Sequence, residues 1–294
     1  MRKRKKFPLG QVVLHIVFLL MVLVYIVPFL MVISVSFTDE KALVREGYHL
    51  IPSVFSTEAY RMVFSDPMQI LYSYGTTITF TLTSTFLAVL VMGIMAYPLS
   101  RPNYRYKGPV TFIVLFTMLF SGGMVPSYLL IVKYLHLNNT IWVYIFPGLV
   151  SAYNLIIIRT NYKSLPGELI EAAKIDGASE MYICFKIVMP LSKPVLASIG
   201  FLFLVNKWND WNTSLLYITN PKLYSLQYLL QKILNEAEYL KQLADTGQLM
   251  GGEVFPTESF RYAMAMVAAG PVLCVFPFFQ KYFAKGMTLG GVKG

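Results

Sequence analysis

The feature that most constrains this chain is a series of long apolar stretches. A helix needs about 20 mostly apolar residues to cross the hydrocarbon core of a bilayer. Six stretches approach or exceed that length, at residues 12–37, 76–99, 109–131, 141–160, 194–216 and 262–283. Backbone polar groups inside a bilayer must bond to one another, which favours helices. The sequence therefore predicts an all-α membrane protein with six transmembrane helices.

Composition supports this class and narrows the partners. With 56% hydrophobic and 14% charged residues, and a mean hydropathy of +0.56, the chain is too apolar for an ordinary soluble domain. The net charge of +10 would suit nucleic acid, but the basic residues flank apolar stretches, so the expected partner is the lipid bilayer and no nucleic acid. The basic segment 1–6 resembles the start of a signal peptide. The stretch after it is too long for a signal core, so we interpret it as a retained first span.

The distribution of basic residues predicts the orientation. If the N-terminus is cytoplasmic, 16 of the 25 Lys and Arg residues lie on the cytoplasmic side and eight lie in mostly longer outer loops. Such an excess marks the cytoplasmic face. We therefore expect both termini, and the basic loop 161–193, to be cytoplasmic.

The spans divide the chain into three parts. Residues 1–75 contain the basic N-terminal segment, the first transmembrane helix and the first outer loop. Residues 76–283 form a core with five transmembrane helices, the loop 161–193 and an outer loop, 218–261. Residues 284–294 form a cytoplasmic tail.

The loop 161–193 carries local signals for two short helices. Pro166 suits a first helical turn, and acidic residues follow early, where the helix dipole favours negative charge. Gly177 can adopt the left-handed conformation that ends a helix. Ser179 can then cap a second helix running to about Val188, and Pro190 opposes its continuation. The sequence predicts a helix–turn–helix held at the membrane surface.

The chain carries no sign of its own energy source. Of its 15 acidic residues, only Asp210 falls in a predicted span, close to the outer end, whereas gradient-driven transporters usually keep a carboxylate near mid-membrane. The sequence also lacks a Gly-x-x-x-x-Gly-Lys-Ser/Thr phosphate-binding loop. A transporter of this kind would draw its energy from a partner; otherwise the chain is a passive pore. A helix–turn–helix on the cytoplasmic side favours the partner.

The spacing within this loop resembles a known signature. Glu171-Ala-Ala, Gly177, Ile187 and Pro190 resemble the cytoplasmic loop of permease subunits of binding-protein-dependent ABC importers. Trp208-Asn209 and the segment 285–294 are similar to carbohydrate-importing permeases of the maltose type. The segments 120–126 and 159–166 resemble the subgroup associated with larger oligosaccharides. Met189 departs from the family, which usually has Leu there, with little expected consequence because the two side chains have similar volumes.

The resemblance implies a type I ABC importer permease fold in a bacterial cell membrane, with specific partners. These are a second homologous permease, two cytoplasmic ATPase subunits, an extracellular or periplasmic solute-binding protein and an oligosaccharide. ATP and Mg would be bound by the ATPase subunits, and this chain would bind no cofactor and catalyse no reaction. The helix within 167–181 would couple to the ATPase through Glu171, Ala172, Ala173, Asp176, Gly177 and Ala178.

Two further contacts follow from the same resemblance. The tail residues Thr288, Leu289, Gly290 and Gly291 would lie near the ATPase. The outer-loop residues Gln248, Gly251, Gly252 and Glu253 would contact the solute-binding protein.

A substrate path is expected at the outer half of the fifth span. Sugars favour aromatic faces and amide or hydroxyl groups, which this segment supplies through Asn206, Trp208, Asn209, Trp211 and Asn212. Interfacial Trp belts and Asn-mediated helix contacts offer an alternative explanation. Lys207 is expected to extend toward the membrane surface or to pair with Asp210.

Three alternatives stay open at this point. The loop signature does not separate a sugar from another solute, such as a peptide or polyamine. An intramembrane enzyme would need a catalytic set, but His15, His49 and His136 show no metal-ligand spacing or paired acid. A purely structural scaffold would leave the loop pattern unexplained.

Overall fold

The computed structural model describes residues 9–246 and 257–286. Within these ranges the regular structure is helical, apart from one isolated bridge between Thr38 and Phe55. The chain divides into two compact units: one contains Met1–Pro67 and Leu230–Gly270, and the other contains Met68–Leu229 and Pro271–Gly294. The all-α prediction is confirmed for the described residues.

The first unit contains α1 and the short helices that follow it. Helix α1 (Leu9–Ser36) is followed by α2 (Glu40–Glu46) and α3 (Glu58–Val63). The unit also holds most of α14 (Leu226–Asp245) and the first half of α15 (Thr257–Gly286). Asp39 caps α2 by accepting from the backbone N–H groups of Lys41 and Ala42, at 3.0 and 3.2 Å.

A buried carboxylate joins two helices of this unit. Glu40 is 5% exposed, and it accepts hydrogen bonds from the backbone N–H groups of Glu258 and Ser259, at 3.0 and 2.9 Å. The Ser259 hydroxyl donates a third bond at 2.8 Å. These N–H groups belong to the first turn of α15 and have no partner within the helix, so Glu40 satisfies them and complements the helix dipole.

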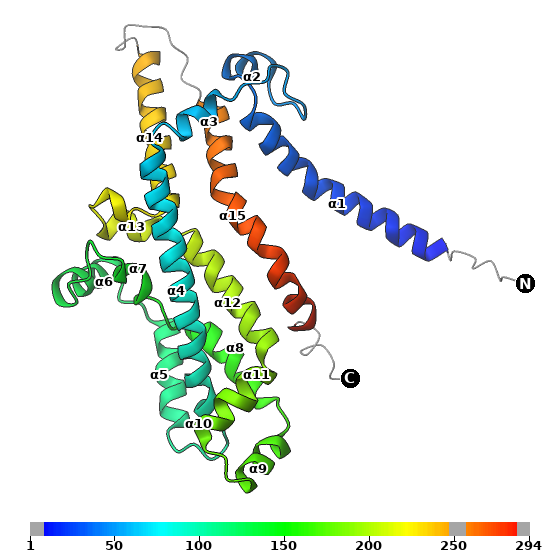
Figure 1. The fold of residues 1–294 in the computed structure, drawn as a ribbon, viewed down its shortest axis with the longest axis vertical. Helices are drawn as coiled ribbons and strands as arrows, with labels where there is room; N and C mark the ends of the chain where they lie inside the picture. The colour runs from blue at the N-terminus through cyan, green and yellow to red at the C-terminus, as the bar shows by residue number, and fades with distance from the viewer. Residues whose placement is uncertain (1–8, 247–256, 287–294) are drawn as a thin grey trace, which may run out of the picture. The chain divides into compact units, whose positions relative to one another are not determined.

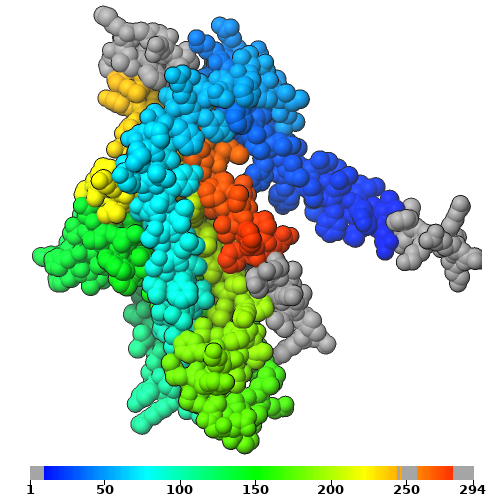
Figure 2. Space-filling view, viewed as in Figure 1, coloured from blue at the N-terminus to red at the C-terminus, as the bar shows by residue number. Residues whose placement is uncertain are grey.

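The second unit is built on the long helix α4 (Pro67–Ser100) (Figure 1). Besides the start of α14 and the second half of α15, its other elements are α5 (Lys107–Leu119), α6 (Met124–Leu129), the π-helix η1 (Leu130–Tyr134), α7 (Trp142–Ile145), α8 (Ala152–Lys163), α9 (Gly167–Ile175), α10 (Glu180–Tyr182), the π-helix η2 (Ile183–Val188), α11 (Met189–Leu191), α12 (Lys193–Trp208), α13 (Asn212–Tyr217) and the 3₁₀-helix η3 (Pro221–Leu223). Helix α8 packs on α5 and α12. Figure 2 shows α4 along one face of this unit, with the segment around 161–193 gathered at its end.

Within the described residues, three helices are long and apolar enough to cross a membrane: Gly10–Ser36, Pro67–Ser100 and Thr257–Gln280. Two bent pairs meet the same test when each is taken together, which gives up to five candidate spans in the described ranges. These pairs are Lys107–Leu119 with Met124–Tyr134, bent by 114°, and Glu180–Leu191 with Lys193–Trp208, bent by 79°. The six-span plan is therefore not reproduced by helix length alone.

Two of the six stretches are interrupted for local reasons. In 109–131 the chain leaves α5 at Phe120 and turns through Gly123, which has φ +84°. In 141–160 helix α7 has only four residues, and Pro147 and Gly148, the latter with φ +72°, separate it from α8. Proline lacks an N–H, and glycine tolerates positive φ without steric cost, so both interruptions follow from these residues.

Candidate functional site

Helix α9 forms as its sequence predicts. Pro166 precedes it, Glu168 lies in its first turn, and Gly177 follows with φ +78°. The Gly177 N–H donates to the Lys174 carbonyl at 3.0 Å, and the Ala178 N–H donates to the Ala173 carbonyl at 2.9 Å. This is the Schellman pattern, which satisfies the last carbonyls of a helix and requires a left-handed residue.

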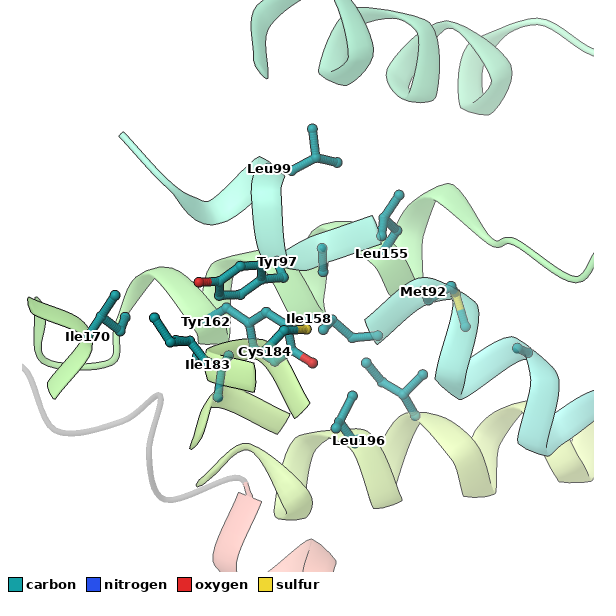
Figure 3. Packing of buried hydrophobic residues seen from close by; sticks show 14 of the residues in the cluster. Met92, Tyr97, Leu99, Leu155, Ile158, Tyr162, Ile170, Ile183, Cys184 and Leu196 are labelled. Atoms are coloured by element: carbon teal, nitrogen blue, oxygen red, sulfur yellow. The ribbon is translucent and has the colours of Figure 1, made fainter. Parts of the chain in front are cut away.

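One side of α9 packs on the core and the other side is open. Ile170 and Ala173 are 5% and 9% exposed. They join a cluster with Ile183 and Cys184 of η2 and with residues of α4, α8 and α12. Figure 3 shows Ile170 reaching toward Ile183 and Cys184. This contact fixes which face of α9 points away from the unit.

The outward face of α9 collects most of the predicted coupling residues. Glu171, Ala172, Asp176 and Gly177 are exposed, Ala178 is half-buried, and Ala173 is buried. This face also carries Ile175, which lies outside the set predicted from the sequence and is 86% exposed. An apolar residue four positions after Glu171, on the face opposite Ile170, was the available signal.

The second helix of the loop differs from expectation at its end. Ser179 caps it by accepting from the Tyr182 N–H at 3.3 Å, as predicted. The chain then continues as the π-helix η2 and passes through Pro190 to Leu191. The wider π turn relaxes the usual hydrogen-bond pattern before the proline. The helix therefore ends at Leu191, three residues beyond the predicted end at Val188, and the 79° bend that separates it from α12 falls at Ser192.

A single carboxylate connects α9 to the end of α4. The Lys174 ammonium lies 2.6 Å from Glu180 Oε1, and the Tyr97 hydroxyl donates to Glu180 Oε2 at 2.5 Å. These two bonds, with Lys174 contributing most, hold the pKa of the Glu180 carboxyl below its usual value. The Arg101 guanidinium lies 4.9 Å from the centroid of the Tyr97 ring, a cation–π contact.

A cavity of about 660 Å³ lies beside this carboxylate. Its walls come from the end of α4, the turn after it, α9 and α10. The wall is apolar at Ile94, Ile170 and Met181, and charged at Arg101 and Glu171. The space between α9 and α4 is therefore only partly filled.

The candidate substrate residues on α12 and α13 separate into two groups. Asn206, Asn209, Trp211 and Asn212 are exposed, whereas Trp208 is 5% exposed. The Asn209 amide is oriented by two bonds: its Nδ2 donates to the Val205 carbonyl at 2.9 Å, and its Oδ1 accepts from Gln227 at 3.1 Å. The exposed Asn side chains thus present neutral polar groups near the end of α12 and at the start of α13.

Lys207 was expected to extend toward the membrane surface or to pair with Asp210, and the structure gives it other partners. Its ammonium donates to the backbone carbonyls of Tyr144 and Pro147, at 2.7 and 3.3 Å. These carbonyls lie where α7 ends, and a cation there satisfies carbonyls that lack partners. Asp210 instead accepts from the backbone N–H and hydroxyl of Thr213. Lys207 therefore stabilises the interruption between α7 and α8.

Eight predicted contact residues lie outside the described ranges. These are the tail residues Thr288, Leu289, Gly290 and Gly291, and the outer-loop residues Gln248, Gly251, Gly252 and Glu253. Within the described ranges, no group of three or more His, Cys, Asp or Glu residues could hold a metal ion.

Residues 89–289 match the family model described as "Binding-protein-dependent transport system inner membrane component", and the chain belongs to this family. The class predicted from the loop signature is confirmed.

Relatives of this chain occur in Bacillus subtilis and Halalkalibacterium halodurans. The chain is 41% identical to Protein LplC over 92% of its own length and 90% of that protein. It is 40% identical to the polygalacturonan/rhamnogalacturonan transport system permease protein YtcP, over 94% and 96% of the two chains. The arabinooligosaccharides transport system permease protein AraQ of Halalkalibacterium halodurans is 30% identical, over 99% and 100%.

A solved structure shares the fold. The crystal structure of a bacterial ABC transporter involved in the import of the acidic polysaccharide alginate contains a chain that superposes with a TM-score of 0.78. The two chains are 26% identical, and the match covers 96% of this chain and 99% of the other.

Proposed function

We propose that this chain is a transmembrane subunit of an ABC importer for an oligosaccharide, and that α9 couples it to ATP hydrolysis by partner subunits. Family membership supports the importer class. The names of YtcP and AraQ, and the alginate importer, support a saccharide over a peptide or polyamine. The observation that carries the coupling role is the outward face of α9, where Glu171, Ala172 and Ile175 are exposed. The other face of this helix packs on the core through Ile170 and Ala173.

This face suits a protein partner on chemical grounds. Ala172 and Gly177 have little or no side chain, so another backbone can approach closely. Glu171 offers a carboxylate to which an Arg can bond bidentately. Ile175 offers an apolar side chain whose burial would stabilise a complex by about 1.5–3 kcal/mol. The partners we propose are two cytoplasmic ATPase subunits, a second permease and a solute-binding protein.

The mechanism we propose is alternating access. Closure of the ATPase dimer would move α9, and this unit would rock against the second permease. ATP and Mg would stay on the ATPase subunits, and this chain would bind no cofactor. Six spans, with both termini and the loop 161–193 cytoplasmic, belong to the same proposal, as do tail contacts at 288–291 and solute-binding-protein contacts at 248–253.

The experiment measures ATP hydrolysis by the copurified complex in lipid nanodiscs. The solute-binding protein is added with galacturonan or arabinan oligosaccharides, and wild type is compared with Glu171→Ala and Gly177→Asp. We expect both substitutions to abolish the stimulation while the complex still assembles. The matched control is Glu58→Gln, which removes an exposed carboxylate in the first unit.

Unchanged stimulation in both α9 variants would refute the coupling role. Equal stimulation by a peptide or polyamine, with no response to any saccharide, would replace the proposed solute and leave the coupling role intact.

A further inference from the structure

Three elements meet at one carboxylate. Tyr97 lies near the end of α4, Lys174 in the last turn of α9, and Glu180 at the start of α10. The ammonium of Lys174 and the hydroxyl of Tyr97 bond to different oxygens of Glu180, at 2.6 and 2.5 Å. We call these three residues the carboxylate clamp.

The clamp connects α9 to α4 across a region that is incompletely packed. All three of its residues line the cavity of about 660 Å³ between α9 and the end of α4. Ile170 and Ala173 supply the apolar contact of α9. Such contact is non-directional and lets one surface slide over another. A charge-assisted hydrogen bond is directional and stronger than a neutral one, so the clamp resists that sliding.

The two ends of the clamp are held in different ways. On the α9 side, Lys174 also accepts the Gly177 N–H at its carbonyl, within the Schellman turn. On the α4 side, the Tyr97 ring contacts the Arg101 guanidinium. Tyr97 is only 6% exposed. Displacement of α9 would therefore be transferred to a buried residue of a 34-residue helix that is long enough to cross the membrane.

We propose that Glu180 is a positioning residue that transmits movement of the coupling helix α9 to the transmembrane helix α4. This inference rests on the proposed function, because it takes α9 as the element moved by the ATPase. With the clamp broken, α9 would still bind the ATPase through its outward face. Its movement would be absorbed in the cavity instead of moving α4.

The test separates hydrolysis from transport. The complete complex is reconstituted in proteoliposomes, and uptake of radiolabelled galacturonan or arabinan oligosaccharide is measured together with ATP hydrolysis. For Tyr97→Phe, Lys174→Met and Glu180→Gln we expect continued hydrolysis, with uptake per ATP reduced about tenfold because charge-assisted bonds are lost. Glu58→Gln, which removes an exposed carboxylate 4.0 Å from Arg61, should behave as wild type.

A charge exchange and a double-mutant cycle give readouts that a purely structural role would not produce. The double variant Lys174→Glu with Glu180→Lys restores the ion pair with its charges exchanged. The ammonium now at position 180 can donate to the Tyr97 oxygen, so uptake per ATP should partly recover. Tyr97→Phe combined with Lys174→Met should lose less than the sum of the single effects, because both act through Glu180.

The outcomes distinguish this inference from the proposed function. If the clamp variants keep normal uptake per ATP while Glu171→Ala and Gly177→Asp abolish stimulation, α9 is the coupling helix and the clamp proposal is wrong. If all five variants behave as wild type, the coupling role itself fails. Loss of assembly in Tyr97→Phe, which removes one hydroxyl, would assign the clamp a structural role and overturn the proposal.

Discussion

At the scale of single residues, burial separates amino acids that look equivalent in the sequence. Trp208 and Asn209 are neighbours and both were expected on the substrate path, but Trp208 is 5% exposed and Asn209 is exposed. An interfacial aromatic side chain has an apolar body that packs readily and a polar atom that needs a partner. Adjacent positions on a helix point about 100° apart, so one side chain can pack on the core while the next one is exposed.

This difference gives a clean test of the substrate path. We expect Asn209→Ala to reduce oligosaccharide uptake about tenfold, as expected for loss of oriented hydrogen bonds to a ligand, with no change in thermal stability. Trp208→Ala should instead destabilise the protein by about 3–5 kcal/mol, because it leaves a cavity. The measurements are uptake in proteoliposomes and the thermal denaturation midpoint of the purified complex.

The matched control for Asn209→Ala is Gln231→Ala, which removes an exposed amide on α14 that bonds to Asn235 of the same helix. Asn220→Ala would be a poor control, because the Asn220 side chain caps η3. Unimpaired uptake by Asn209→Ala would remove this residue from the substrate path. A Trp208→Ala variant that is stable but impaired in uptake would show that Trp208 belongs to the substrate path after all.

At the scale of elements, the sequence predicted helix ends correctly where residues close together in the chain determine them. The start of α9, its stop at Gly177 and the cap at Ser179 follow from residues within a few positions of one another. Near Pro190 such signals locate the end of the helix only to within a few residues, because a π turn precedes the proline and the helix ends at Leu191 instead of Val188. The bond between Tyr97 and Glu180 joins residues 83 positions apart. Neither partner has a local signal for it, so it could not be predicted.

The cap of α15 gives a prediction about one element that depends on a distant residue. Glu40 bonds to the first turn of a helix more than 200 residues later in the chain. We expect Glu40→Ala to lower the free energy of unfolding by about 1–2 kcal/mol, because it leaves helix N-terminal donors without their partner. Glu40→Gln should lose less, since its amide oxygen can still accept a bond.

The measurement is the denaturation midpoint in detergent, supported by limited proteolysis between α14 and α15. Glu46→Ala is the matched control, because it removes an exposed carboxylate from the end of the same short helix α2. Equal midpoints for Glu40→Ala and Glu46→Ala would show that the cap adds nothing to stability.

At the scale of the whole molecule, orientation follows from charge and not from any single contact. Sixteen basic residues on one side and eight on the other predict that α9 faces the cytoplasm. Coupling to a cytoplasmic ATPase requires this orientation, so the coupling role and the clamp both depend on it.

Cysteine labelling in intact bacteria tests the orientation directly. The background carries Cys184→Ser and Cys274→Ser, since both native cysteines are free and Cys274 is exposed. Lys41→Cys and Lys163→Cys then place single thiols at exposed positions in the first outer loop and at the end of α8. A membrane-impermeant maleimide should label position 41 in intact cells, or in spheroplasts if an outer membrane is present, and position 163 only after permeabilisation. The reverse pattern would place α9 outside the cell, beyond reach of an ATPase, and both the coupling role and the clamp would have to be abandoned.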